Sequence, residues 1–229
     1  NFANFVDSSS CVGLANGLDA LEISMRALGI KGGDEVIVPS HTFIATWLAV
    51  SNCGATPVPV SPNIETSLID VSEIEKAITK RTKAIMPVHL YGQSVDLDPI
   101  LDLADTYKLF VIEDAAQAHG AVYKSKKLGC HGDVVAWSFY PGKNLGAFGD
   151  AGGITTNRDD LAEKIRILGN YGSKKKYVHN VIGSNSRLDP MQATVLDVKL
   201  NFLDEWNSRR VQIAQKYLME LENSNLKLP

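Results

Sequence analysis

Along the chain, short apolar stretches alternate with longer amphipathic stretches. This pattern is typical of βα units arranged around a mostly parallel sheet. Most of the apolar stretches are continuous rather than alternating, which indicates strands that are buried on both faces. The predicted strands cover residues 35–39, 56–60, 83–88, 109–113, 134–139 and 153–156.

The amphipathic stretches predict helices with recognisable ends. Asn16 and Asp70 are candidate N-caps, and Glu73 would complete a capping box with Asp70. Gly29 and Gly54 supply left-handed stops for the helices that precede them. The predicted helices cover residues 17–28, 42–53, 71–78, 97–107 and 158–169.

Length and composition favour one large α/β domain, because 229 residues with 45% hydrophobic content can bury a substantial core. From about Asp189, the spacing of apolar positions predicts one long or broken helix that leads out of this domain. The chain has no initiator methionine and stops at Leu228-Pro229, so we expect it to be a fragment of a longer protein.

Charge and cysteine content exclude several classes of function. The net charge of −3 provides no electrostatic footprint for nucleic acid or for an anionic membrane. No apolar run approaches the roughly 18 to 20 residues of a membrane span. The three cysteines are scattered, which suits a reducing cytoplasm. Histidines and cysteines show no metal-ligand spacing, so we expect no metal site.

Unexplained polar residues follow several predicted strands, at the sheet edge where ligands of parallel sheets bind. Asp114 comes directly after an apolar strand and is either a helix cap or a ligand for a cationic group. Lys143 lies in a turn after the next strand. It is either a solvated surface charge or a partly desolvated amine that can form a Schiff base with an aldehyde. The loop that precedes Gly17 opens a helix and suits a phosphate.

These features fit one cofactor, pyridoxal 5'-phosphate (PLP). It needs a lysine for its aldehyde, a carboxylate that keeps its pyridine nitrogen protonated, an anion site and a flat partner for one face. The sequence can supply each of these groups.

An ordered series of motifs then resembles a known family. The motifs are Gly-Asp-Glu-Val-Ile-Val-Pro-Ser at 33–40, Thr-Phe-Ile-Ala-Thr at 42–46, His-Leu-Tyr-Gly-Gln at 89–93, Glu-Asp-Ala-Ala-Gln-Ala-His-Gly at 113–120, Ser-Phe-Tyr-Pro-Gly-Lys-Asn-Leu-Gly at 138–146 and Asn-Ser-Arg-Leu-Asp at 185–189. In this order they resemble the DegT/DnrJ/EryC1/StrS family of sugar aminotransferases. The resemblance implies the large domain of the type I fold of PLP-dependent transferases, a three-layer sandwich with a mostly parallel central sheet, over residues 1–229. A small C-terminal domain would follow the helix that starts near residue 189.

The resemblance also implies roles for particular residues. Lys143 would hold the cofactor as a Schiff base and act as general acid and base, and Asp114 would lie under the pyridine nitrogen. Gln117 would lie near the phenolic oxygen of the cofactor, and Phe43 would stack on its ring, although an aromatic residue at such a position is often ordinary core.

The phosphate would lie against the amides of Gly17 and Leu18 and the hydroxyl of Ser138. Asn185 would reach in from the neighbouring subunit of a homodimer with a shared active site. Members of the family commonly have Gly-Thr-Ala where this chain has Gly17-Leu18-Asp19, so a threonine hydroxyl is missing while the amides remain.

The implied reaction moves an amino group from L-glutamate to a keto sugar nucleotide, in the biosynthesis of deoxyamino sugars for lipopolysaccharides or antibiotics. The chain looks most similar to cytoplasmic members that aminate carbon 3 of a dTDP-linked 3-keto-6-deoxyhexose. The alternatives are a 4-keto sugar nucleotide aminotransferase and a non-catalytic regulatory or sensory paralogue. A sugar dehydratase on this scaffold carries histidine in place of the lysine, so Lys143 argues against that reaction.

Some residues near the same edge keep two interpretations. His89, Tyr91 and His119 are either packing residues or neighbours of the sugar or the cofactor. The lysines at 174–176 form either a solvated loop or a contact for a diphosphate.

Overall fold

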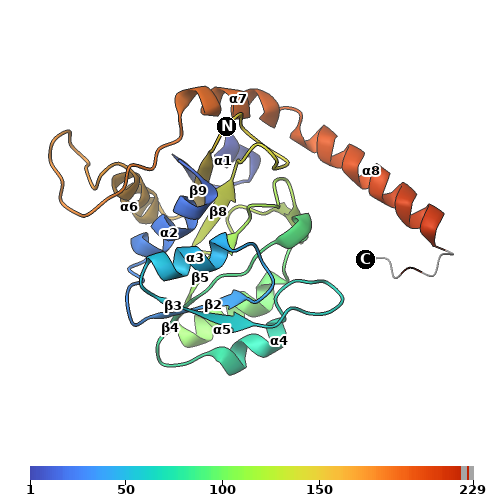
Figure 1. Ribbon diagram of the computed structural model, residues 1–229, viewed down its shortest axis with the longest axis horizontal. Coiled ribbons are helices and arrows are strands. Elements are labelled where there is room, and N and C mark those ends of the chain that lie inside the picture. Colours follow the sequence, from blue (N-terminus) through green and yellow to red (C-terminus); the bar gives the residue numbers. More distant parts are fainter. Residues whose placement is uncertain (223–225, 227–229) are drawn as a thin grey trace.

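A seven-stranded sheet forms the centre of the computed structural model, which describes residues 1–222 and 226 (Figure 1). The strand order is β1-β9-β8-β5-β4-β2-β3. All neighbouring pairs are parallel except β1 with β9 and β8 with β9, which are antiparallel. The mostly parallel sheet that the buried apolar runs predict is therefore confirmed. The strands are β1 Ser10–Leu14, β2 Glu35–Pro39, β3 Thr56–Val60, β4 Thr82–Ile85, β5 Phe110–Asp114, β8 Val134–Ser138 and β9 Gly152–Thr156.

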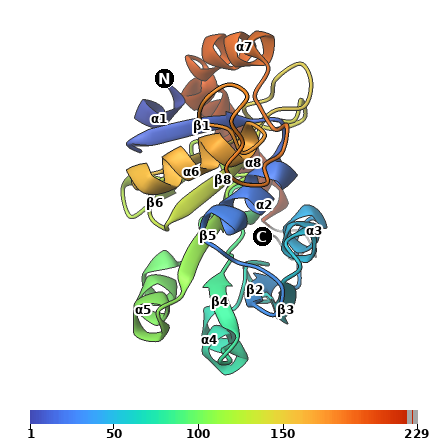
Figure 2. The ribbon, with the colours of Figure 1, turned by 90° about the vertical axis from the view of Figure 1, so that its left-hand side faces the viewer.

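Helices cover both faces of the sheet, as a three-layer sandwich requires (Figure 2). Strand residues alternate between the two layers: Val36 and Val38 pack with the helices on one face, whereas Ile37 packs on the other. The first face carries α2 Gly17–Ala27, α3 Ala45–Asn52 and α6 Asp159–Gly169. The opposite face carries α4 Val71–Ile74, its continuation as a 3-10 turn over Glu75–Ala77, and α5 Leu97–Tyr107.

The predicted helix from residue 189 onward is broken into two. Asp189 caps α7 Pro190–Leu200 by accepting the N–H of Met191 at 2.8 Å. The second helix, α8 Leu203–Leu221, extends away from the sheet in Figure 1, and Leu203 is its one buried residue. Residues 223–225 and 227–229 of the predicted domain lie outside the described residues.

Most predicted helix ends are confirmed. Asn16 Oδ1 accepts the N–H of Asp19 at 2.8 Å, and Asp70 Oδ1 accepts the N–H of Ser72 at 3.0 Å. Gly29 and Gly54 have φ values of 83° and 74°, in the left-handed region that such stops require.

The prediction that Glu73 completes a capping box is wrong. The N–H of Asp70 donates to the carbonyl of Ser61 at 3.0 Å, and the Glu73 carboxylate instead binds Lys76 at 2.7 Å. Glu73 is therefore drawn along its own helix by a nearer cation, and the α-helix gives way to a 3-10 turn after Ile74.

Five short elements are absent from the sequence-based prediction. They are α1 Phe2–Phe5, strand β1, the 3-10 turn Leu90–Gly92, and the hairpin of β6 Val122–Tyr123 and β7 Lys126–Lys127. Strand β1 was not predicted, because Gly13 lies in the segment before Gly17, where the sequence pattern indicates a loop. The structure needs glycine there since a Cβ would lie 2.7 Å from Leu188 Cβ. None of the described helices is long and apolar enough to cross a membrane.

Candidate active site

A cavity of about 590 Å³ lies at the carboxyl edge of the parallel strands. Because β5 and β8 are parallel neighbours, their last residues, Asp114 and Ser138, emerge at the same edge. The cavity brings together seven of the eight residues that the sequence predicts for a cofactor site: Gly17, Leu18, Phe43, Asp114, Gln117, Ser138 and Lys143. The eighth, Asn185, does not line it.

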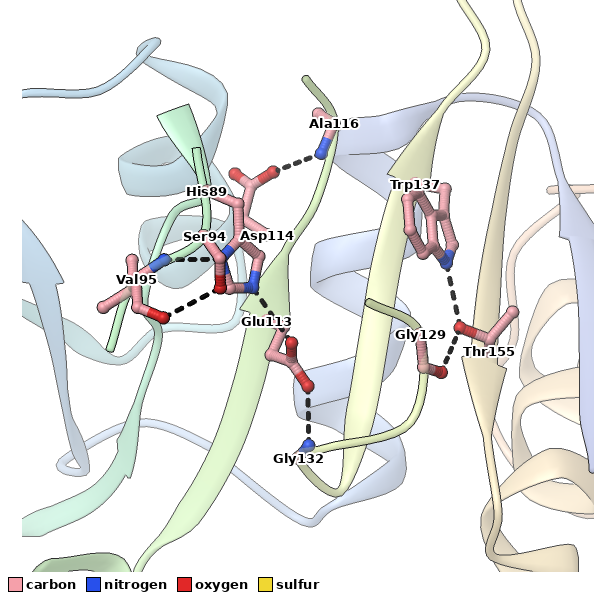
Figure 3. Close-up of polar contacts among 10 residues, drawn as sticks. All are labelled: His89, Ser94, Val95, Glu113, Asp114, Ala116, Gly129, Gly132, Trp137 and Thr155. Carbon is pink, nitrogen blue, oxygen red and sulfur yellow. Dashed lines mark hydrogen bonds and ion pairs between the residues drawn. The ribbon is translucent and has the colours of Figure 1, made fainter. Parts of the chain in front are cut away.

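Asp114 is a buried carboxylate, with 5% of the residue exposed. Its Oδ2 accepts the hydroxyl of Thr46 at 2.9 Å. Its Oδ1 accepts the N–H of Ala116 at 3.1 Å, a bond that Figure 3 shows. No helix begins within residues 115–121, so Asp114 does not serve as a helix cap.

Burial raises the pKa of the Asp114 carboxyl above its usual range, and the bonds from Ala116 and Thr46 together with the charge of Lys143 offset part of this rise. The folded chain thus holds the Asp114 proton more tightly than the unfolded chain does. Ionisation of Asp114 therefore opposes folding of the cofactor-free protein: this cost is fully present above the raised pKa and disappears as the pH falls through it. A cation held at the carboxylate would relieve the cost.

Behind Asp114, a buried pair of side chains holds the end of β5 in place (Figure 3). His89 Nε2 and Glu113 Oε2 are 2.9 Å apart, and neither side chain is exposed. The N–H of Val95 donates to His89 Nδ1 at 3.1 Å, so Nδ1 carries no proton and Nε2–H donates to Glu113. The second oxygen of Glu113 accepts the N–H of Gly132 at 2.6 Å. The backbone N–H of His89 donates to the carbonyl of Asp114 at 3.0 Å, so His89 has a packing and positioning role.

Lys143 lies in a tight turn after β8 and is partly buried. Its N–H donates to the carbonyl of Tyr140 at 2.8 Å. The turn admits only glycine at position 146, because a Cβ there would lie 2.4 Å from the carbonyl oxygen of Pro141. Lys143 borders the 590 Å³ cavity on one side and a second cavity of about 630 Å³ on the other.

The first turn of α2 meets Ser138 at the opposite side of the cavity. The Asn16 side chain satisfies the N–H of Asp19, whereas the helix offers no acceptor to the N–H groups of Gly17 and Leu18. A Cβ at Gly17 would lie 2.6 Å from Ser138 Cβ, so only glycine allows these two segments to approach so closely. The result is a cup of backbone amides and a hydroxyl, which suits an anion.

Phe43 and Gln117 complete the lining. Phe43 is 69% exposed at the cavity, so it is not a core residue, and a flat group inside the cavity would find its ring available. The helix that the sequence predicts from residue 42 begins only at Ala45, which leaves Phe43 in the preceding loop. Gln117 Oε1 accepts the N–H of Tyr91 at 2.9 Å, which orients the amide and leaves its NH₂ group as a donor.

Two other predicted residues, Asn185 and His119, lie outside this cavity. Asn185 is exposed and forms an isolated β-bridge with Asn170, so within one chain it stays apart from the cavity. His119 packs against Trp137 and Phe139 at ring-centroid distances of 5.4 and 5.6 Å. Burial, followed by the charge of Lys143, lowers the pKa of His119 to about 3, so it is a neutral packing residue.

In the loop at 174–176, Lys174 forms an ion pair with Glu163. None of the three lysines lines either cavity beside Lys143. Among the described residues, no group of three or more His, Cys, Asp and Glu side chains is placed to hold a metal ion.

The contact between Thr46 and Asp114 was not predicted from the sequence. Thr46 belongs to one of the motifs, but no local pattern indicates that its hydroxyl reaches a carboxylate 68 positions away. The sequence offered a weak signal only in retrospect, since Thr46 is the one polar residue among the first six residues of α3.

The structure thus places a buried carboxylate and a lysine in one cavity at the carboxyl edge of a three-layer α/β fold. The DegT/DnrJ/EryC1/StrS aminotransferase family model matches residues 1–229. The chain belongs to this family.

Relatives agree with this assignment. The chain is 56% identical over 228 residues to a dTDP-3-amino-3,6-dideoxy-alpha-D-galactopyranose transaminase from Aneurinibacillus thermoaerophilus, covering 100% of this chain and 63% of the relative. It is 55% identical over 222 residues to the erythromycin biosynthesis sensory transduction protein EryC1 of Saccharopolyspora erythraea, covering 97% and 61%.

Among solved structures, the crystal structure of DesV from S. venezuelae in complex with a ketimine intermediate superposes with a TM-score of 0.96 at 52% identity, covering 100% of this chain and 63% of that one. The chain thus spans about three fifths of the length of the relatives it matches.

Proposed function

We propose that this chain is the cofactor-binding part of a PLP-dependent transaminase that moves an amino group from L-glutamate to carbon 3 of a dTDP-linked 3-keto-6-deoxyhexose. The observation that carries the proposal is the meeting of Lys143 and Asp114 in one cavity with the first turn of α2. The transaminase name of the Aneurinibacillus relative, at 56% identity, supports the choice of substrate.

The residues around the cavity fit PLP on physical grounds. The buried Asp114, whose ionisation is costly without a neighbouring positive charge, suits a protonated pyridine nitrogen. The close approach of Gly17 to Ser138 leaves an amide-lined cup for the phosphate. Lys143 supplies the amine that the cofactor's aldehyde requires. When bound, the cofactor would provide the electron sink that a transamination needs.

Each residue of this chain would then have a defined task. Asp114 would keep a proton on the pyridine nitrogen, and the Thr46 hydroxyl would hold the carboxylate in position. Gln117 would donate from its NH₂ group to the phenolic oxygen. Lys143 Nζ would carry the proton between the amino donor's α-carbon and the cofactor carbon. Phe43 would cover one ring face and exclude water.

We further propose a cytoplasmic homodimer in which Asn185 enters the cavity of the neighbouring subunit. Two observations support the dimer. Asn185 is exposed although it belongs to a motif of the family, and the apolar side chains of Phe43, Ile44 and Leu48, which line the cavity, are exposed within one chain.

A regulatory or sensory function is the second candidate, because a relative at 55% identity carries the name of a sensory transduction protein. Such a paralogue would bind the cofactor without turning over a sugar. Cofactor binding and turnover must therefore be measured separately.

The test uses the full-length protein that contains this chain. Wild type should show the visible absorbance of a lysine-bound cofactor, Lys143→Ala should lose it while remaining folded, and Lys80→Ala, an exposed lysine outside both cavities, should keep it. Glutamate and a panel of 3-keto and 4-keto nucleotide sugars would then be supplied, with mass spectrometry of the products. A coloured protein that aminates none of these sugars would favour the sensory candidate, and a folded colourless protein would refute both.

A further inference from the structure

Lys143 also lines a second cavity, of about 630 Å³, which Asp114 does not line. The second cavity is enclosed by the loop at 117–121, the turn at 142–144 and α8. Gln117 and Lys143 line both cavities, so the second cavity adjoins the lysine that is proposed to bind the cofactor. Its volume falls within the range of about 300–1,000 Å³ that small-molecule sites occupy.

The lining of this cavity is positive and rich in amides. Lys143 and Arg210 are its charged residues, and within the described part of the chain no Asp or Glu lines it. An anion that entered would meet two cations and would not be repelled by a carboxylate. The amide side chains of Gln117, Asn144 and Asn207 supply further polar groups.

The Arg210 guanidinium has no carboxylate partner among the described residues, and the Asn207 side chain that it contacts is fixed by further hydrogen bonds. Its guanidinium contacts Asn207 Oδ1 at 3.3 Å, and among residues 1–222 no carboxylate forms an ion pair with it. Asn207 is in turn held by Asn144 Nδ2 at 3.0 Å and donates to the carbonyl of His119 at 2.8 Å. These bonds connect α8 to both loops that enclose the cavity.

We propose that this cavity receives a carboxylate of the amino donor and that Arg210 binds it. The inference rests on the proposed function and specifies the site of the second substrate. In an amino acid, the α-carboxylate is attached to the same carbon as the amino group, so it lies close to Lys143. Among the described residues that line the two cavities beside Lys143, Arg210 is the one other cation, and it lines the second cavity. The diphosphate of a nucleotide sugar is separated from the keto carbon by several bonds and fits this position less well. A guanidinium matches a carboxylate with two parallel hydrogen bonds.

The chain offers a matched pair of variants for the test. Arg210→Gln removes the charge in the cavity, Arg210→Lys keeps a charge without the fork, and Arg209→Gln removes a charge from the neighbouring residue of α8, which does not line the cavity. The full-length holoprotein would be titrated with glutarate, a dicarboxylate without an amino group, by calorimetry, and with L-glutamate by the change in cofactor absorbance.

Arg210→Gln should raise the half-saturating concentration of both ligands roughly 10-fold to 150-fold, the range for losing a hydrogen bond to a charged group. Arg210→Lys should lie between wild type and Arg210→Gln, Arg209→Gln should match wild type, and the KM of the nucleotide sugar should stay unchanged. An unaltered response to both ligands in Arg210→Gln, a wild type that binds no glutarate, or a raised KM for the nucleotide sugar alone would overturn the proposal.

The two proposals can fail separately. Arg210-dependent glutarate binding without amino transfer would preserve this site and refute the transaminase. Amino transfer with glutarate binding that ignores Arg210 would do the reverse.

Discussion

Gly17 provides the sharpest test of the proposed phosphate site. Replacing it with alanine adds one methyl group to the first turn of α2, and that Cβ would lie 2.6 Å from Ser138 Cβ and 3.2 Å from Ser138 Cα. Ordinary contacts begin at 3.4 Å, so α2 and the end of β8 must move apart by about 0.8 Å. The contact is with a strand end rather than with a flexible side-chain tip, so little of this strain can be relieved locally.

The magnitude follows from the cost of adding a methyl group to a well-packed place, about 1–3 kcal/mol. Alanine at a helix start is otherwise at least as favourable as glycine, so the contact with Ser138 dominates. If the cofactor-free protein relaxes this contact by spreading and must restore the close approach to hold the phosphate, the Kd for PLP rises roughly 5-fold to 150-fold. If the contact stays strained in the cofactor-free protein, part of the cost appears as a lower free energy of unfolding.

The assay combines a PLP titration followed by visible absorbance with urea unfolding of the cofactor-free protein. Gly32→Ala is the matched control, because a Cβ at Gly32 would lie 3.7 Å from its nearest neighbour, the carbonyl oxygen of Gly54, far from the site. Gly17→Ala with the PLP affinity and the stability of wild type would refute both the packing argument and the placement of the phosphate.

Further predictions concern the buried carboxylates. Thr46→Val removes the donor to Asp114 Oδ2 and should weaken PLP binding by about 1.5–3 kcal/mol in the same titration, whereas Thr46→Ser should bind like wild type. Asp114→Asn should raise the free energy of unfolding of the cofactor-free protein at neutral pH, because it removes a buried carboxyl whose pKa is raised and whose ionisation opposes folding. The gain should shrink as the pH falls through that pKa, where wild type is neutral too, and an equal gain in acid would contradict the argument. Glu113→Gln places an NH₂ group against either the Nε2–H of His89 or the N–H of Gly132, both of which are donors. The free energy of unfolding in urea should therefore fall by about 1–3 kcal/mol. The exposed control Glu73→Gln should lower it by less than about 0.5 kcal/mol. Equal losses in these two variants would count against the buried network.

Much of the architecture was readable from local patterns. The continuous apolar run at 35–39 predicted a buried parallel strand, and Asn16 and Asp70 predicted helix starts, because burial on two faces and the needs of helix ends are expressed within a few consecutive residues. Errors arose where another contact competes. The Glu73 carboxylate forms an ion pair with Lys76 instead of the expected capping bond. Strand β1 forms only by pairing with β9, which lies far away in the sequence.

The chemistry of the candidate site divides in the same way. The sequence by itself determined which groups are present at the carboxyl edge: a carboxylate after β5, a lysine after β8 and a glycine at the start of α2, because the order of strands and turns places them there. It also determined the family, through motifs that occur in a set order.

Only the tertiary structure decided what these groups do to one another. Asp114 owes the direction of its pKa shift to burial by segments far apart in the chain, and its partner Thr46 lies 68 positions away. Lys143 borders two cavities, and the second exists because α8 brings Arg210 beside the turn at 142–144. Desolvation and charge proximity depend on distances through space, and a linear pattern does not contain those distances.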